Sequence, residues 1–205
     1  MGFYEEKCLP LILNFACGMK PIREQRQKMV PLASGRILEV GMGSGLNIPF
    51  YNSENVELVW GLEPSQGMRD KAKDKVAGAP FKIEMIDLPG EEIPLEDNSV
   101  DTVLLTFTLC TIPDWHKALE QMRRVLKPGG KLIFCEHGLA RDESVRKWQH
   151  RINPYWNKFA GGCNLNRPIP ELLETGGFKI ESVESDYKPG PKPLNFFYQG
   201  IASAS

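Results

Sequence analysis

The chain has 205 residues, of which 41% are hydrophobic and 25% are charged, and its formal net charge is −1. This length fits one domain with a single core, and the balanced charge argues against a nucleic-acid-binding surface and favours a small or neutral substrate. The cysteines are scattered without a CxxC pair or a Cys/His run at metal-ligand spacing, so we expect no disulfide framework, no metal site and a reducing, cytoplasmic location for Cys8, Cys17, Cys110, Cys135 and Cys163.

The N-terminal segment is predicted to be helical from residue 4 to about residue 30. Its apolar run, CLPLILNFACGM, is only about a dozen residues long and contains Pro10 and Asn14, so neither a signal peptide nor a stable membrane span is expected. Because this extension has no partner of its own, we expect it to fold over the rest of the chain. We therefore predict that residues 1–30 form a helical lid and that residues 31–205 form one domain.

From residue 36 onward, segments with strand and helix character alternate. Strands are predicted over 36–40, 56–62, 81–85, 99–107, 131–137, 178–185 and 195–204, with a short helix start at 47–51 and helices over 65–78, 114–126 and up to Gly176. Strands that alternate with helices predict a parallel sheet. We therefore expect an α/β, Rossmann-like fold with seven mostly parallel strands, helices on both faces and one antiparallel edge strand.

A glycine loop follows the first predicted strand, in the sequence RILEVGMGSG. The spacing is E-x-G-x-G-x-G from Glu39 to Gly45, and Leu46 stands where a dinucleotide fingerprint requires its third glycine. The carboxylate of Glu39 would repel a phosphate and attract an ammonium group. A second carboxylate, Glu63, ends the next strand, where folds of this kind bind ribose hydroxyls. A ribose, an ammonium group and no phosphate together indicate S-adenosylmethionine (SAM).

Four motifs in order resemble the class I SAM-dependent methyltransferases: LEVGMGSG, GLEPS, SVDTVLLTFTLC and RVLKPGGKLIF. The resemblance covers the chain from Arg36 to its C-terminus and implies SAM as the cofactor. The residues expected to bind it are Glu39, Gly41, Met42, Gly43, Gly45, Asn47, Glu63, Pro64, Ser65, Met68, Leu88, Gly90, Glu91, Thr106 and Leu109.

Some of these assignments have a simpler alternative. The three glycines also suit a tight turn that binds nothing, and Glu63 suits a solvated acid at a strand end. The segment Leu88–Pro94, which lies where the family covers the adenine, also suits an ordinary loop. Met68 packs either on the adenine or into the core.

Within the superfamily, the chain most resembles the methyltransferase-like-7 group, which methylates small thiols, and related bacterial proteins. The segments CEHG, WQHRINPYWNKFAGGCNLNR and FYQGIASA carry this likeness. It implies a small, apolar acceptor with a reacting sulfur. A quinone-type C-methyltransferase, a phospholipid N-methyltransferase and a SAM-binding protein without catalysis are the alternatives, and no oligomeric state is predicted.

His137 is the predicted catalytic base, because it follows the fifth strand on the side where the cofactor should lie. A thiol has a pKa near 8.5, so a neighbouring imidazole would raise its thiolate fraction near neutral pH. Glu136 is expected to orient His137 or to line the pocket. The alternative is a structural histidine, and His116 and His150 are weaker candidates.

The segment from Trp148 to Arg167 is expected to supply the acceptor side. Its aromatic residues are predicted either to wall an apolar acceptor site or to pack in the core: Trp148, Tyr155, Trp156 and Phe159. Cys163 is expected either to line the acceptor pocket or to be an ordinary buried cysteine. Arg167 either fastens this segment or meets an anionic acceptor.

Overall fold

The computed structural model describes residues 8–204. The helices are α1 (Leu9–Cys17), α2 (Lys20–Met29), α3 (Gln66–Ala77), α4 (Trp115–Val125), α5 (Glu143–Phe159) and α6 (Ile169–Thr175). The strands are β1 (Gly35–Val40), β2 (Val56–Leu62), β3 (Lys82–Ile86), β4 (Val100–Thr106), β5 (Leu126–His137), β6 (Phe178–Tyr187) and β7 (Phe196–Ala204). Short 3-10 turns η2 (Val30–Leu32), η3 (Ile48–Phe50) and η4 (Lys192–Leu194) complete the described chain.

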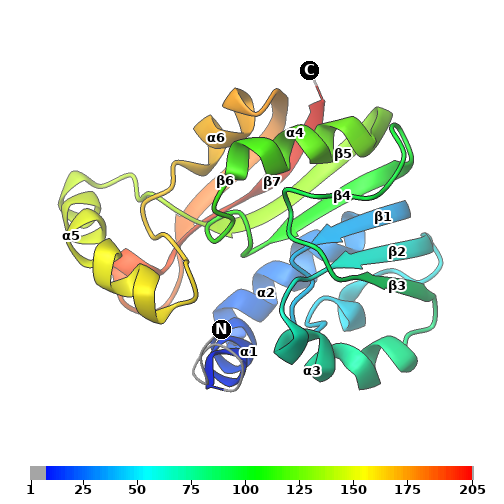
Figure 1. Ribbon diagram of the computed structural model, residues 1–205. Coiled ribbons are helices and arrows are strands. Elements are labelled where there is room, and N and C mark those ends of the chain that lie inside the picture. The colour runs from blue at the N-terminus through cyan, green and yellow to red at the C-terminus, as the bar shows by residue number, and fades with distance from the viewer. Residues whose placement is uncertain (1–7, 205) are drawn as a thin grey trace.

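The seven strands form one sheet in the order β3-β2-β1-β4-β5-β7-β6. Strands β1 to β5 pair in parallel, and β7 runs antiparallel to both β5 and β6. Figure 1 shows α4 and α6 on one face of the sheet, with α1, α2 and α3 on the other. The predicted Rossmann-like class is confirmed.

The predicted antiparallel edge strand is wrong in one respect, because the antiparallel strand β7 lies inside the sheet. The edge strand is β6, which runs in the same direction as β5 and pairs only with β7. Most residues of β6 are exposed, whereas β7 is largely buried or half-buried. The polar run ESVES suits an edge, and the more apolar FFYQGIASA suits an inner strand.

Two apolar clusters hold the helices to the sheet. Phe134 and Leu119 lie in the cluster beneath α4 and α6, and Ile37 and Leu104 lie in the cluster on the opposite face. Because both faces are covered, the inner strands are nearly continuous apolar runs, and four consecutive residues of β1 are buried. This pattern explains why the strands were predictable.

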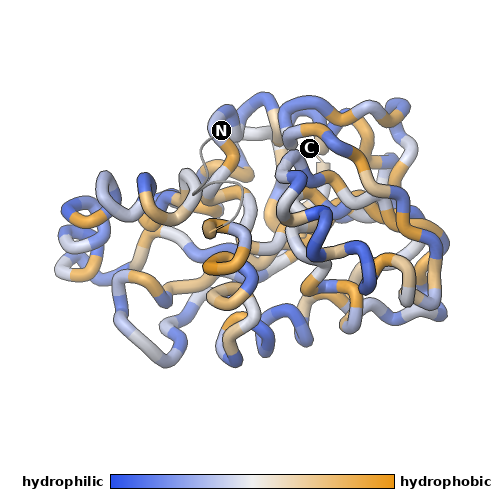
Figure 2. The backbone as a smooth tube through the Cα atoms, turned by 60° about the horizontal axis from the view of Figure 1, so that its bottom comes forward, coloured by the Kyte–Doolittle hydropathy of each residue, from blue (hydrophilic) through white to orange (hydrophobic). Residues whose placement is uncertain are grey.

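The described part of the N-terminal extension, residues 8–30, is mainly helical, as expected, but its two helices differ in character. Residues 4–7 of the predicted helical segment lie outside the described residues. Figure 2 shows that α1 is mostly apolar and α2 mostly polar. In α1 only Pro10 is buried, whereas α2 buries Gln25, Arg26 and Met29. Met29 and the following Val30 belong to the core beneath the sheet. The expected division at residue 30 stays a prediction, and α2 is the better anchored helix.

Candidate active site

The loops at the carboxyl ends of β1, β2, β4 and β5 meet at one edge of the sheet. In open parallel sheets, ligands bind at this edge where the strand order reverses, here between β1 and β4. The loop after β1 begins at Gly41, whose φ is +70°, and a side chain there would collide with Thr108. Gly43 has φ of +60°, and an added Cβ would lie 3.2 Å from Met68 Cε. Both positions therefore favour glycine.

Glu63 fastens the glycine loop to the end of β2. Its Oε2 accepts the backbone amide of Gly43 at 2.9 Å, and its Oε1 accepts the amide of Ser65 at 2.9 Å. The residue is only 8% exposed, so it is not the solvated acid of the alternative reading. Burial raises the pKa of its carboxyl above the ordinary value.

Glu39 lies at the centre of a buried polar network. Its Oε2 accepts from the Tyr51 hydroxyl at 2.6 Å, and its Oε1 accepts from Asn47 Nδ2 at 2.8 Å. Asn47 Nδ2 also lies 2.8 Å from Thr106 Oγ1. Burial raises the pKa of Glu39 to about 7 in spite of these bonds. The network joins the loop after β1 to the end of β4.

Arg26, on α2, completes this network and was missed at the sequence level. Its Nη1 donates to Asn47 Oδ1 at 2.6 Å and to Thr106 Oγ1 at 2.8 Å. The residue is 6% exposed, and its buried Nε has no partner among the described residues. One arginine in the polar run IREQRQK carries no signal that separates it from its solvated neighbours.

The first helix also contacts the glycine loop. The Ser44 hydroxyl donates to Asn14 Oδ1 at 2.6 Å, and Lys75 Nζ donates to the Ser44 carbonyl at 2.8 Å. Both helices of the N-terminal extension therefore meet the predicted cofactor loop. A cavity of about 450 Å³ lies beside it, lined in part by Arg23, Arg26 and Lys75.

Three of the remaining cofactor candidates are buried. Met42 packs beneath the sheet, Leu109 is fully buried in the core under α4, and Gly90 packs against Val40 and Ile112. These residues support the loops of the candidate site by packing in the core. Their contact with a cofactor stays a prediction.

Other candidates lie on the loops after β2 and β3. Pro64 is exposed, Met68 and Leu88 are half-buried, and Leu88 packs against the core. Glu91 Oε1 accepts the backbone amide of Asp114 at 3.1 Å, so the segment after β3 is tied to the start of α4. The predicted residues thus surround one edge of the sheet.

Glu136 anchors the loop after β4. Its Oε1 accepts the amides of Thr108 at 2.7 Å and Leu109 at 3.0 Å, and its Oε2 has no partner among the described residues. The side chain is fully buried, which raises its pKa to about 8. These contacts give Glu136 a positioning role for the loop. Its predicted action on His137 stays a prediction.

His137 lies beside two cysteines from distant parts of the chain. Its Nε2 is 2.8 Å from Cys163 Sγ, and Cys163 Sγ is 3.6 Å from Cys110 Sγ. The three potential ligand atoms lie within 4.8 Å of one another. The bond from Cys163 and the positive charge of His137 hold the pKa of the Cys110 thiol well below its usual range. All five cysteines, which lie within the described residues, are free.

The segment after α5 holds this cluster in place. Asn164 donates twice to the Cys110 carbonyl, from its backbone amide at 2.9 Å and from Nδ2 at 3.1 Å. Arg167 Nη1 donates to the Leu109 carbonyl and, at 2.8 Å, to the Ile112 carbonyl. Of the two expectations for Arg167, the contacts match the one in which it fastens the segment.

The expectation of core packing is wrong for three of the four aromatic residues. The exposed fractions of Trp148, Tyr155 and Phe159 are 57%, 70% and 69%, while Trp156 is half-buried. They lie on α5, which Figure 1 shows set apart from the other helices. Their role as an acceptor wall stays a prediction.

The two other histidines lie outside the cluster. His116 stacks edge-on against Trp115 at the start of α4, and Nδ1 of the exposed His150 pairs with the half-buried Asn166 at 2.9 Å.

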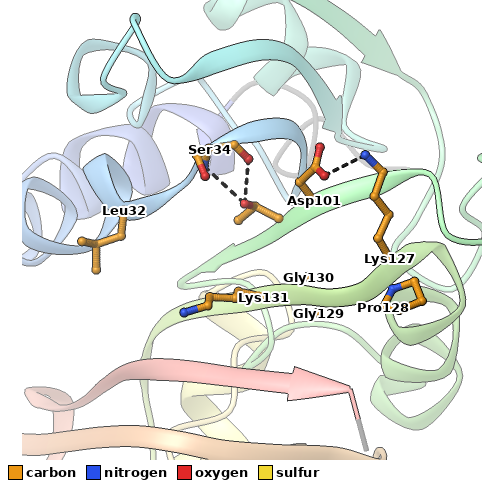
Figure 3. A pocket seen from close by; sticks show the side chains of 9 residues that line it. Leu32, Ser34, Asp101, Lys127, Pro128, Gly129, Gly130 and Lys131 are labelled. Carbon is orange, nitrogen blue, oxygen red and sulfur yellow. Dashed lines mark hydrogen bonds and ion pairs between the residues drawn. The ribbon is translucent and has the colours of Figure 1, made fainter.

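A second hollow lies at the amino ends of the strands, and Figure 3 shows the residues that line it. It has a volume of about 270 Å³ and is lined by the segment that precedes β1 and by the amino ends of β4 and β5. Within this hollow, Lys127 forms an ion pair with Asp101 at 2.7 Å. Hydrogen bonds also join Thr102 to Ser34. The glycine loop lies at the other ends of these strands, so this hollow is separate from the candidate site.

Comparisons with known proteins agree with this arrangement. A family described as "Methyltransferase domain" matches residues 38–134. The human thiol S-methyltransferase TMT1B is 33% identical over 174 residues, covering 82% of this chain and 69% of that protein. The ubiquinone/menaquinone biosynthesis C-methyltransferase UbiE of Geobacter sulfurreducens is 36% identical over 118 residues, covering 55% and 46%. The chain therefore spans only part of the length of these relatives.

The fold also matches solved structures. A protein from Thermotoga maritima, described as a SAM-dependent methyltransferase and possible histamine N-methyltransferase, has a TM-score of 0.68 and 21% identity. The match covers 98% of this chain and 97% of that one. Between residues 8 and 204, none of the helices has the length and apolar character needed to span a bilayer.

Proposed function

The chain belongs to the SAM-dependent methyltransferases, and from this premise we propose that it methylates a small, apolar acceptor at a thiol sulfur. The observation that carries the proposal is the position of His137 Nε2, 2.8 Å from a cysteine sulfur at the carboxyl end of β5. A site that already accommodates two sulfur atoms beside an imidazole suits a third sulfur from an acceptor. The likeness to a thiol S-methyltransferase supports the same acceptor class.

SAM is the cofactor of this family, and the residues at the sheet edge fit its groups. The partnerless buried Nε of Arg26 is suited to a carboxylate, and Glu39 beside it is suited to an ammonium group. Glu63, at the end of β2, is suited to ribose hydroxyls. When bound, SAM supplies a methyl group on a positively charged sulfur that is already activated for transfer.

The chain's own contribution is alignment and control of the acceptor proton. Glu136 and Arg167 fix the loop after β4 through backbone groups of Leu109. His137 Nε2 is proposed as the atom that acts on the acceptor thiol. Because a thiol is mostly protonated at pH 7, removal of its proton is the step that needs a protein group.

The experiment is a methyl-transfer screen on matched acceptors. Benzyl mercaptan, benzyl alcohol, benzylamine and a short-chain demethylquinol are each incubated with the full chain and SAM, and the products are identified by mass spectrometry. We expect the thioether to form fastest. Carbon methylation of the quinol with no thioether would contradict the proposal and favour the second candidate, a quinone-type C-methyltransferase, which the likeness to UbiE supports.

A further inference from the structure

Cys110, His137 and Cys163 have the composition and spacing of a metal site. Tetrahedral zinc, with Zn–S bonds of about 2.3 Å and Zn–N bonds of about 2.0 Å, places two sulfur ligands about 3.8 Å apart and a sulfur and a nitrogen about 3.5 Å apart. The two sulfurs here lie 3.6 Å apart. His137 Nε2 lies 2.8 Å from Cys163 Sγ, so the imidazole needs to retreat by less than about 1 Å.

The surrounding hydrogen bonds hold the ligands before any metal arrives. Asn164 makes two bonds to the Cys110 carbonyl, which join the loop after β4 to the segment that carries Cys163. Asn157, on α5, donates to the Gly162 carbonyl at 2.6 Å, one residue before Cys163. Outer contacts of this kind orient metal ligands and raise metal affinity.

The charges of the three ligands also suit a divalent cation. Two cysteine thiolates carry a charge of −2 and the neutral imidazole carries none, so one Zn²⁺ makes the group neutral. Both cysteines are buried, with exposed fractions of 1% for Cys110 and 8% for Cys163. Neutrality matters here because an unpaired charge is costly to bury.

Among the described residues, the cluster has only these three ligands. Glu136 is adjacent in sequence to His137, but its carboxylate is not among the ligand atoms that lie close together. Zinc sites with four protein ligands are usually structural, whereas sites with three leave a position for water or substrate. His137 is half-buried, so the cluster is not sealed on all sides.

We propose that Cys110, His137 and Cys163 bind a zinc ion whose fourth position receives the sulfur of the acceptor thiol. The identity of the fourth ligand rests on the proposed function. The acceptor loses its S–H proton to water as the zinc–sulfur bond forms, and the zinc remains Zn²⁺ with no electron transferred. The bound sulfur keeps lone pairs for attack. His137 then serves as a ligand, and the metal takes over the lowering of the thiol pKa.

The first experiment measures zinc binding without any methyl transfer. The full chain is kept reduced with a phosphine, stripped with a chelator and dialysed against Zn²⁺, and bound metal is measured by mass spectrometry. We expect one zinc per chain, with affinity reduced at least about tenfold in Cys110→Ala and Cys163→Ser. Cys135→Ala is the matched control, because Cys135 is equally buried but lies among apolar residues. Thermal unfolding confirms that each variant is folded.

Absence of zinc binding by the wild type, or equal affinity in the folded cysteine variants, would overturn the proposal. His137→Asn provides an independent variant if a cysteine replacement does not fold.

A second experiment separates the metal site from the proposed function. Cobalt(II) replaces zinc, and its visible absorption, which responds to sulfur ligands, is followed as benzyl mercaptan or benzyl alcohol is added. We expect the visible absorption to change when benzyl mercaptan is added and to stay the same when benzyl alcohol is added. Equal rates of thiol methylation with and without metal would overturn the proposed role of zinc and leave thiol methylation intact. A cobalt response to the thiol with no thioether product would support the metal site and contradict the proposed function.

Discussion

Arg26 Nη1 donates to Thr106 Oγ1 at 2.8 Å, which joins the N-terminal helix α2 to the carboxyl end of β4. The same nitrogen donates to Asn47 on the loop after β1. A guanidinium is rarely buried without a partner that requires it. Arg26 therefore brings the N-terminal extension into contact with the candidate cofactor site, and the role of the extension as a lid stays a prediction.

Replacement of Arg26 with Gln should weaken SAM binding at least about tenfold, or about 1.4 kcal/mol, because a charge-assisted bond to the cofactor carboxylate is lost. Calorimetry measures the affinity, and Lys28→Gln is the control because Lys28 is exposed on the same helix and does not line the cavity. If both variants bind SAM like the wild type, Arg26 only braces the loops.

Replacement of Glu63 with Ala should lower SAM affinity by at least about 1.5 kcal/mol, in line with the loss of charged hydrogen bonds. The matched control is Glu57→Ala, at the exposed opposite end of β2. Because Glu63 also holds the amides of Gly43 and Ser65, folding is checked by thermal unfolding. Unchanged affinity in a folded Glu63→Ala protein would remove Glu63 from the site.

Stability without SAM should fall as the pH rises from about 4.5 to about 7, because Glu39 has a folded-state pKa of about 7 against an ordinary value of 4.5. Across this window the folded state binds a proton that the unfolded state has released. The groups near Glu39 are Arg26, Tyr51 and Glu63. The loss is at most about 3 kcal/mol from the size of the shift.

Denaturant unfolding of the wild type and Glu39→Gln at pH 5 and pH 7.5 measures this contribution, because other titrating groups cancel in the difference. The wild type should lose stability relative to the variant as the pH rises. A constant difference between the two proteins would contradict a raised pKa for Glu39.

The sheet and the glycine loop were predictable because their signals are local. A strand such as β1 is a continuous apolar run, and positive φ angles at Gly41 and Gly43 explain why glycine stands at these positions. The position of β7 inside the sheet was not predicted. Two adjacent C-terminal strands suggest a hairpin, but they do not show which of them faces β5.

The parts of the site that were missed depend on contacts between distant segments. Cys110 and Cys163 are 53 residues apart, and His137 is 26 residues from Cys163. No run of sequence carries the spacing of such a cluster, so its cysteines looked scattered. The loop after β4, which carries Cys110, and the segment after α5, which carries Cys163, must both reach the end of β5 before the three side chains meet.

Deletion of residues 1–18 should leave the sheet folded while raising the Michaelis constant for the acceptor or abolishing turnover. In the described part of α1 only Pro10 is buried, yet Asn14 contacts Ser44 in the glycine loop. The cut stops before α2 because Met29 lies in the core. Circular dichroism and steady-state kinetics provide the measurements. Normal kinetics in the folded, shortened protein would show that α1 has no role as a lid.

Replacement of His137 with Gln should lower thiol methylation at pH 7 by about a hundredfold, which is the usual scale for a group that controls a proton. SAM affinity should stay close to that of the wild type, because the carboxylates and the glycine loop lie elsewhere on the sheet edge. His116→Gln is the control, since His116 lies on α4 outside the cluster.

If His137 binds zinc, turnover of His137→Gln should stay low as the pH approaches 8.5, the pKa of a free thiol, because the metal ligand is still missing. Recovery of turnover at that pH would instead identify His137 as a base that free thiolate no longer needs. Wild-type turnover at pH 7 would exclude both roles and leave a site that acts by alignment alone.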